Sequence, residues 1–557
     1  MKKNVLALSI AAMIGGLGFA GAASAVVING TGAAPTTAVL GATNADGFTL
    51  TTGGTGHNLI VPYYTAQDGN MTVLHLTNTD TVNGKAVKIR FRGAANSDDV
   101  LDFQILMSPG DVWTGAVTAG ANGIAQLTTA DGTCTVPSLT KGVAQSFDTR
   151  RLQPTLSDAD KAAGTREGYV EIFNMADING ASIYTVAGLT NQKSPLFTAV
   201  KHVNGTAPCT ASVINAAMLK TDHDEASAAG AGFATPTTGL MGDWYIINVA
   251  KTTTFSGAAT ALTATVAATG AAGRGNFVVF PQLSSAAPTP DSFTADASLR
   301  ATLANVFTSK AQDGTGTAAT ATANLPVVEA AYYDLPDLST PYLVPATTAI
   351  TAAGAQAQAQ LLTQALAVKS ITNQYANDAS ITAKTDWVFS MPTRRYSVAM
   401  DYRGTTPVRV FTPGVVGVDP DGAGALVGDA FFYTGNTTVE GGKICVSSNG
   451  QSFWDREETT KSTGAVFSPG SVDKTRFCGE TSVLSFGDAG VSVLGATVAR
   501  QDTGSSAYVN GWSAITTSNG TAGLPILGSA FIKLTNPQAS AGMSGTYGIT
   551  WPHRFTK

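Results

Sequence analysis

The alternation of apolar and polar residues between Asn58 and Gly115 constrains the fold of this 557-residue chain more than any other feature. It is clearest in residues 85–92, where apolar side chains alternate with cations. The apolar side chains are Val87, Ile89 and Phe91, and the cations are Lys88, Arg90 and Arg92. Successive side chains of a strand point to opposite faces of a sheet, so this pattern predicts a half-buried strand with a cationic, solvent-exposed face.

Four such runs follow one another in this stretch. They are Asn58–Thr65, Met71–Thr79, Lys85–Arg92 and Val100–Met107. The connections at Gln67–Asn70 and Asn83-Gly84 contain residues that tolerate positive φ and therefore close tight turns. The order predicts a β-meander on an antiparallel sheet with one exposed face, and we take it as the start of a large β-sandwich.

Further β-type runs occur in both halves of the chain, among them Glu167–Phe173, Asp243–Ala250 and Thr385–Met391. A chain of this length usually divides into several domains. We therefore predict a mainly β protein with one or two large antiparallel β-sandwich domains, Ig-like or jelly-roll-like, and a small helical insertion. The predicted parts are an N-terminal sandwich at 26–290, a helical insertion or linker at 291–383, and a C-terminal β domain at 384–557, which alternatively completes the same sandwich.

Two helices are predicted in the central part. Asp296–Lys310 carries one apolar stripe at helical spacing, and Thr351–Val368 is rich in residues of high helix propensity. A single helical turn is predicted at Leu156–Lys161, capped by Ser157. The Thr-rich run Thr252–Val266 is interpreted as an exposed strand pair, with a mobile linker as the alternative.

Residues 1–25 have the features of a Sec-type signal peptide, because a basic start precedes an apolar run and an Ala23-Ser24-Ala25 cleavage pattern. The first cysteine is Cys134, so the run is not a lipoprotein signal, and no later stretch is long and apolar enough to span a bilayer. We expect an exported protein without a transmembrane segment after cleavage, located at the cell surface or outside the cell, with the periplasm as the alternative.

The composition agrees with export, since only 13% of residues are charged. The formal net charge of −5 argues against a nucleic acid partner, which would require a basic surface.

The four cysteines are Cys134, Cys209, Cys445 and Cys478. An even number in an exported chain indicates two disulfides. Three pairings exist, and proximity in the sequence favours Cys134–Cys209 with Cys445–Cys478. The alternative, a four-cysteine metal site, would need closer ligand spacing than this chain has.

Three segments resemble a family of secreted proteobacterial proteins that are described only as hypothetical or cell-surface proteins. They are Ser370–Tyr396, with its TDWV and PTRR motifs, Gly242–Ala250 and Phe453–Glu458 (FWDREE). The stretch from Asn58 to Gly115 is similar to the N-terminal part of that family. Met391 and Arg394 depart from the family pattern, in which Phe and often Lys occupy these positions. The resemblance implies a location at the cell surface and no particular chemistry.

The best candidate for a cation site is an acidic loop formed by Asp419, Asp421 and Asp429. Calcium prefers several oxygen ligands from closely spaced carboxylates and carbonyls, so this loop would hold Ca²⁺; a plain turn is the alternative interpretation. No other cofactor is predicted. His223 lies between two aspartates and is interpreted as part of a solvated acidic loop, and His75 as a residue on the exposed face of its strand.

No signature of nucleophilic, metallohydrolase or nucleotide-dependent catalysis occurs in the sequence. The adjacent Glu457 and Glu458 are interpreted as a strand end, because neighbouring strand residues point to opposite faces and cannot act on one substrate.

Three classes of function fit these observations. The first is a structural protein of the cell surface that self-associates into a coat or array, as S-layer proteins do. The second is an adhesin or glycan-binding module that contacts the cell envelope or a surface glycan through exposed aromatics such as Tyr332, Tyr333 and Trp512. A secreted hydrolase is the third, and the lack of catalytic signatures argues against it.

Overall fold

The computed structural model describes residues 26–220, 222–279, 282, 333–334, 352–402, 406–411, 428–457, 475–486, 492–502, 509–517, 522–540 and 543–557. The predicted signal peptide at 1–25 and the predicted helix Asp296–Lys310 lie outside these residues. The described chain is mainly β, with many antiparallel sheets and few helices, which confirms the predicted fold class.

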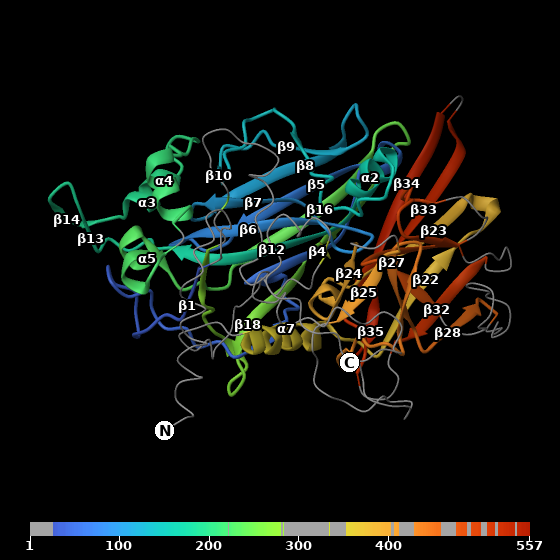
Figure 1. Ribbon diagram of the computed structural model, residues 1–557. Helices are drawn as coiled ribbons and strands as arrows, with labels where there is room; N and C mark the ends of the chain where they lie inside the picture. The colour runs from blue at the N-terminus through green and yellow to red at the C-terminus, as the bar shows by residue number, and fades with distance from the viewer. Residues whose placement is uncertain are drawn as a thin grey trace, which may run out of the picture.

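Two large sheets form the N-terminal half (Figure 1). The nine-stranded sheet has the order β10 (Cys134–Val136), β7 (Asp99–Met107), β6 (Gly84–Gly93), β12 (Glu167–Ile178), β4 (Asn58–Thr65), β18 (Thr260–Val266) and β19 (Ala271–Ala272), with β15 (Phe233–Ala234) beside β12 and β2 (Gly47–Leu50) beside β18. The seven-stranded sheet has the order β11 (Gln145–Ser146), β9 (Ala125–Thr128), β8 (Val112–Ala119), β5 (Met71–Asn78), β16 (Leu240–Asn248) and β17 (Thr253–Ala258), with β3 (Thr55–Gly56) beside β16.

The inner faces of these two sheets form a sandwich with one hydrophobic core. Leu74, Leu76 and Trp113 from the seven-stranded sheet meet Val87 and Ile89 from the nine-stranded sheet in this core. Burial of large apolar side chains between two faces is the main stabilising contribution in such an arrangement.

The helices lie outside the sandwich. They are α2 (Asp158–Thr165), α3 (Pro195–Val200), α4 (Ala211–Met218), α5 (Glu225–Ala231) and α7 (Ala352–Leu366), with short 3₁₀ turns η1 (Gln67–Gly69), η4 (Ala379–Ile381) and η5 (Arg394–Tyr396). Helices α3, α4 and α5 cover one end of the nine-stranded sheet over a second core cluster (Figure 1). That cluster also includes strands β1 (Val26–Ile28) and β20 (Phe277–Val279), which pair with each other, and the hairpin β13 (Tyr184–Val186) and β14 (Leu189–Gln192) lies at the same end.

Smaller sheets make up the C-terminal half. The largest has the order β31 (Arg500–Asp502), β30 (Thr481–Phe486), β23 (Ala383–Ser390), β33 (Leu527–Ser540) and β34 (Met543–Pro552). A second has the order β28 (Gly450–Asp455), β32 (Asn510–Thr516), β22 (Ser370–Ala376) and β35 (Arg554–Thr556). Two three-stranded sheets consist of β26 (Thr437–Glu440), β27 (Lys443–Ser447) and β29 (Arg476–Cys478), and of β21 (Tyr333–Asp334), β24 (Val398–Asp401) and β25 (Val408–Phe411).

The two halves meet in the first core. Phe531 of β33 packs against Tyr63 of β4, Trp244 of β16 and Phe255 of β17, with ring centroids 5.4–6.3 Å apart. Val388 and Val483 of the C-terminal sheet belong to the same cluster. The C-terminal strands therefore extend the core of the N-terminal sandwich.

The predicted meander is wrong. Strand β5 belongs to the seven-stranded sheet, whereas β4, β6 and β7 belong to the nine-stranded sheet, and β12 lies between β4 and β6. Of the four runs, only β6 and β7 form a hairpin. The period of two shows which side chains share a face, but a strand from distant sequence decides the neighbours.

The exposed cationic face predicted for residues 85–92 is also wrong. Lys88 and Arg90 have no exposed surface, and Arg92 is 3% exposed. The outer face of the nine-stranded sheet is covered at this point, and acidic side chains from neighbouring strands neutralise the cations.

The Thr-rich run consists of strands, as predicted, but they do not pair. Strand β17 lies in the seven-stranded sheet and β18 in the nine-stranded sheet, and the chain passes between the sheets at Ala259. Strand β18 is mostly buried, because it lies within its sheet beside β4.

Two helical predictions are confirmed. Helix α2 begins after Ser157, whose side chain accepts the N–H of Asp160 as an N-cap. Helix α7 lies within the predicted range 351–368 and packs against β2 and η5. No helix in the described part of the chain has the length and hydropathy needed to cross a membrane.

Candidate functional site

A cluster of buried charges joins the two halves of the molecule. Glu171 of β12 accepts hydrogen bonds from Arg395 at 2.6 and 2.7 Å and from Arg92 of β6 at 3.3 Å. Arg394 is paired with Glu480, and both are fully buried. We call Arg92, Glu171, Arg394, Arg395 and Glu480 the junction cluster.

The hydrogen bonds of the junction cluster hold the main chain as well. Arg394 Nη1 donates to the Ile444 carbonyl at 2.9 Å, and the Glu480 N–H donates to the Ala94 carbonyl at 2.8 Å. Burial raises the pKa of Glu480, and the charge of Arg394 opposes that shift. Every contact named here is consistent with a role in holding the halves together.

The residues of the PTRR and TDWV motifs have structural roles, and the two arginines of PTRR belong to the junction cluster. Arg394 and Arg395 are its two C-terminal cations. Trp387 is buried in the C-terminal core, and its indole N–H donates to the Gln374 carbonyl at 2.8 Å. Asp386 accepts the Ser492 hydroxyl at 2.6 Å and the Leu494 N–H at 3.0 Å. Through these contacts the motif residues position the chain.

A pocket of about 440 Å³ lies along the same seam. Its lining includes Asn96 and Asp98 from the N-terminal half and Tyr402 and Lys443 from the C-terminal half. The Tyr402 hydroxyl donates to Asp98 Oδ1 at 3.3 Å, and Asn96 Nδ2 donates to the Gly442 carbonyl at 2.7 Å. These hydrogen bonds cross the seam, so the polar groups that line the pocket also connect the two halves.

Both disulfides have the pairing that proximity favoured. Cys134–Cys209 connects β10 to the segment before α4, and Cys445–Cys478 connects directly opposite residues of β27 and β29. All four cysteines are oxidised, so the alternative four-cysteine metal site is excluded. Disulfides are compatible with an exported protein, since they persist in oxidising compartments.

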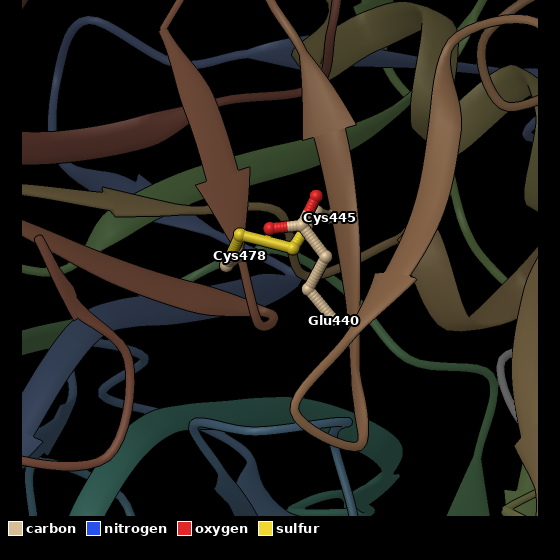
Figure 2. Close-up of side chains that lie close together, drawn as sticks. All are labelled: Glu440, Cys445 and Cys478. Atoms are coloured by element: carbon tan, nitrogen blue, oxygen red, sulfur yellow. A yellow bond between two sulfur atoms is a disulfide. The ribbon is translucent and has the colours of Figure 1, made fainter. Parts of the chain in front are cut away.

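Glu440 lies beside the second disulfide (Figure 2). Among the described residues, Glu440, Cys445 and Cys478 are the one group of three potential metal ligands with atoms within 4.8 Å of one another. The two sulfur atoms are bonded to each other and are not thiolates, and the Glu440 carboxylate is paired with Arg476. The group is therefore a cross-strand disulfide beside an ion pair and lacks the donors that a metal needs.

Of the predicted calcium ligands, the structure describes only Asp429, because Asp419 and Asp421 lie outside the described residues. Asp429 is 4% exposed, and its Oδ1 accepts the N–H groups of Phe431 and Phe432, both at 2.8 Å. Its Oδ2 accepts the Ser397 hydroxyl, and burial raises its pKa. Asp429 thus caps a buried turn, and the calcium site itself stays a prediction.

Of the two histidines discussed above, His75 lies where it was predicted and His223 does not. His75 lies on the outer face of β5, as predicted, in edge contact with Tyr245 at a centroid distance of 5.3 Å. The solvated acidic loop predicted for His223 is wrong. His223 is 8% exposed and contacts Phe233 and Phe277, and its ring nitrogens lie 2.8 Å from the Ala217 carbonyl and 3.4 Å from the Ser227 hydroxyl.

Strand β34 forms an edge that sequence reasoning did not single out. It is the last strand of its sheet, and no other described strand is hydrogen-bonded to its outer side, although β17 packs against β34 at Gly548. Its ten residues, MSGTYGITWP, include no charged side chain. Tyr547 and Trp551 on this strand are 61% and 42% exposed. Natural proteins usually protect sheet edges with charges or bulges, so a long uncharged edge is a surface able to pair with another strand.

Two stacked tryptophans, the half-buried Trp454 and the exposed Trp512, lie on the C-terminal four-stranded sheet. Trp454 of β28 and Trp512 of β32 are directly opposite, with centroids 3.9 Å apart and ring planes 9° from parallel. The two rings come from neighbouring strands and stack face to face, so each ring covers one face of the other. The arrangement differs from the flat aromatic platform expected of a glycan-binding surface. Tyr332 and Glu458 lie outside the described residues.

No family model, curated protein or solved structure matches this chain, so the resemblance to secreted cell-surface proteins stays a prediction.

Proposed function

We propose that this protein is an exported structural protein of the cell surface, which self-associates edge to edge into an S-layer-like coat. The observation that carries the proposal is the uncharged, unpaired edge of β34 with its exposed Tyr547 and Trp551. An exposed strand edge offers a row of backbone donors and acceptors, and pairing with the same edge of a second copy satisfies them.

Three further features support this function. The disulfides suit an oxidising compartment. The conspicuous buried charges, including the junction cluster, bond to neighbouring protein groups and hold the molecule together. The low charge of the chain, 13% of residues, weakens electrostatic repulsion between packed copies.

Glycan binding is the alternative proposal, with Trp512 as its best candidate contact because 40% of it is exposed. Trp454 covers one face of that ring, whereas sugar recognition by stacking uses an open face. We therefore favour the coat.

The test compares assembly of the protein without residues 1–25 with that of Tyr547→Lys and Leu189→Lys, by light scattering and negative-stain microscopy. Leu189 on β14 is a matched control, because it is 63% exposed and lies far from the β34 edge. We expect assemblies of the parent protein and of Leu189→Lys. A charge on the edge should weaken association by at least tenfold, about 1.4 kcal/mol. A parent protein that stays monomeric at every concentration, or equal loss in both variants, would contradict the proposal.

A further inference from the structure

Three ionisable side chains meet on the buried outer face of the nine-stranded sheet. Lys88 of β6 and Asp102 of β7 have no exposed surface, and Asp99 is 9% exposed. Arg90 is directly opposite Asp102 in the β6–β7 register, so Lys88 is its diagonal neighbour on the same face. The register shifts at Val100, and this β-bulge turns Asp99 to the same face as Asp102.

The Lys88 amine is in direct contact with its acidic neighbour. Its Nζ donates to Asp102 Oδ1 and to Gln282 Oε1. Burial lowers the pKa of Lys88 to about 8, although the Asp102 charge opposes the shift. A lysine in this state yields its proton more readily than one in water, and its neutral amine is a nucleophile.

Asp99 adds to the Lys88–Asp102 ion pair a second carboxyl group that can carry a proton. Burial, and after it the charge of Asp102, raises the pKa of Asp99 well above its usual range. Asp99 therefore takes up a proton more readily than an exposed aspartate does, and it lies beside the carboxylate that Lys88 touches. A buried carboxylic acid next to a reacting pair can donate and accept protons as a general acid and base.

We propose that Lys88 and Asp102 are joined in the folded protein by an intramolecular amide bond, formed without another protein and with Asp99 as the proton carrier. The structure brings the amine, the carboxyl group and the acid together in a site that excludes water, which favours loss of water and protects the product.

The reaction balances within the three groups. A proton passes from the Lys88 ammonium to Asp102, which gives a neutral amine and a carboxylic acid. Nζ then forms a bond to Asp102 Cγ, one C–O bond of that carboxyl breaks, and the oxygen leaves as water after Asp99 protonates it. Asp99 recovers its proton from Nζ. The products are an amide and one water molecule, and no oxidant or cofactor is needed.

Lys85 on the same strand provides an internal comparison. It is fully buried and pairs with Asp177 at 2.9 Å, but it also donates to the Thr237 carbonyl and hydroxyl. No second carboxyl group among the described contacts of Lys85 matches Asp99. If a buried lysine–aspartate pair were sufficient for cross-linking, Lys85 and Lys88 would both be linked. The proposed reaction also needs Asp99, so we expect a link at Lys88 and none at Lys85.

The experiment is mass spectrometry of the purified, unfolded and reduced protein. We expect an intact mass lower than the sequence mass by one water molecule. Trypsin does not cleave after an amide-linked lysine, so Ala86–Arg90 should be recovered joined to Gly93–Lys141. A full sequence mass together with a free Ala86–Lys88 peptide would overturn the proposal. A mass lower by one ammonia, with Lys88 joined to Gln282, would also overturn it.

Variants test the roles of the three groups. Lys88→Arg and Asp102→Ala should show their full sequence masses, and the control Lys85→Arg should still lack one water. Asp102→Asn should expel ammonia and reach the same final mass as the cross-linked parent, because the amide produced is identical. Asp99→Asn should leave most molecules unlinked while keeping the Lys88–Asp102 contact. Complete linkage in Asp99→Asn would remove Asp99 from the mechanism.

Discussion

At the scale of single residues, two histidines lie in buried sites that favour the neutral ring, and their hydrogen bonds select its tautomer. His553 Nε2 donates to the Val388 carbonyl at 2.8 Å, and its Nδ1 accepts Asn373 Nδ2 at 2.9 Å, so the partners select one neutral tautomer. His57 is held in the same way by the Gly273 carbonyl and the Ala264 N–H, both at 3.1 Å. Burial lowers the pKa of His553 to about 4 and that of His57 to about 3.

The sign of the resulting pH dependence follows from proton linkage. Between the unfolded pKa of 6.5 and these folded values, the unfolded chain binds a proton that the folded chain does not. The free energy of unfolding therefore falls as the pH drops below about 6.5, by up to roughly 1.4 kcal/mol per pH unit for each histidine.

We predict that His553→Gln removes part of this slope. The difference in unfolding free energy between parent and variant should shrink by on the order of 3 kcal/mol from pH 7 to pH 4, as measured by urea denaturation at each pH. The comparison variant is His75→Gln, which removes a histidine from the outer face of β5 instead of a buried one. Parallel profiles for the parent and His553→Gln would show that His553 is not held neutral.

At the scale of elements, the disulfides secure parts that have little core of their own. Cys134–Cys209 closes a separation of 75 residues and ties the three-residue strand β10 to the chain before α4. Cys445–Cys478 closes 33 residues between β27 and β29. A cross-link stabilises mainly by reducing the freedom of the unfolded chain, and the effect grows slowly with loop length.

We predict that replacing Cys134 and Cys209 by alanine lowers the free energy of unfolding by about 4 kcal/mol. The Cys445 and Cys478 pair should cost about 3–4 kcal/mol, since its loop is shorter. Chemical denaturation of both variants checks the order. Peptide mapping without reduction should recover the two linkages in the parent, and free thiols at these positions would contradict the prediction.

At the scale of the whole molecule, the junction cluster and the shared core make the two halves one structure. Glu171 neutralises arginines from both halves, Arg92 and Arg395. Removal of one partner from a buried ion network leaves the remaining charges without compensation, which costs more than the loss of an exposed pair.

We predict that Glu171→Gln lowers the free energy of unfolding by about 3–5 kcal/mol. The matched control is Asp68→Asn, because Asp68 and its partner Lys251 are 48% and 42% exposed, and this change should cost less than about 1 kcal/mol. Calorimetry should show one transition for the parent protein, since Phe531 belongs to the core of both halves. Two separate transitions would show that the halves unfold independently.

The sequence alone determined the local features. The period of two placed the strands, Ser157 marked the start of α2, composition predicted α7, and proximity favoured the observed disulfide pairing. Each of these depends on residues close together in the chain, where backbone geometry and side-chain spacing are sufficient.

Only the tertiary structure decided which strands pair and what covers each face. Residues 85–92 were expected to expose their cations, because nothing nearby in the sequence covers them. In the fold, β12 inserts beside β6 and supplies Glu171, and Arg395 reaches the same carboxylate from more than two hundred residues away. The period of two shows that Lys88, Arg90 and Arg92 share a face, but the burial of that face depends on contacts between distant segments. The buried group of Lys88, Asp99 and Asp102 exists for the same reason.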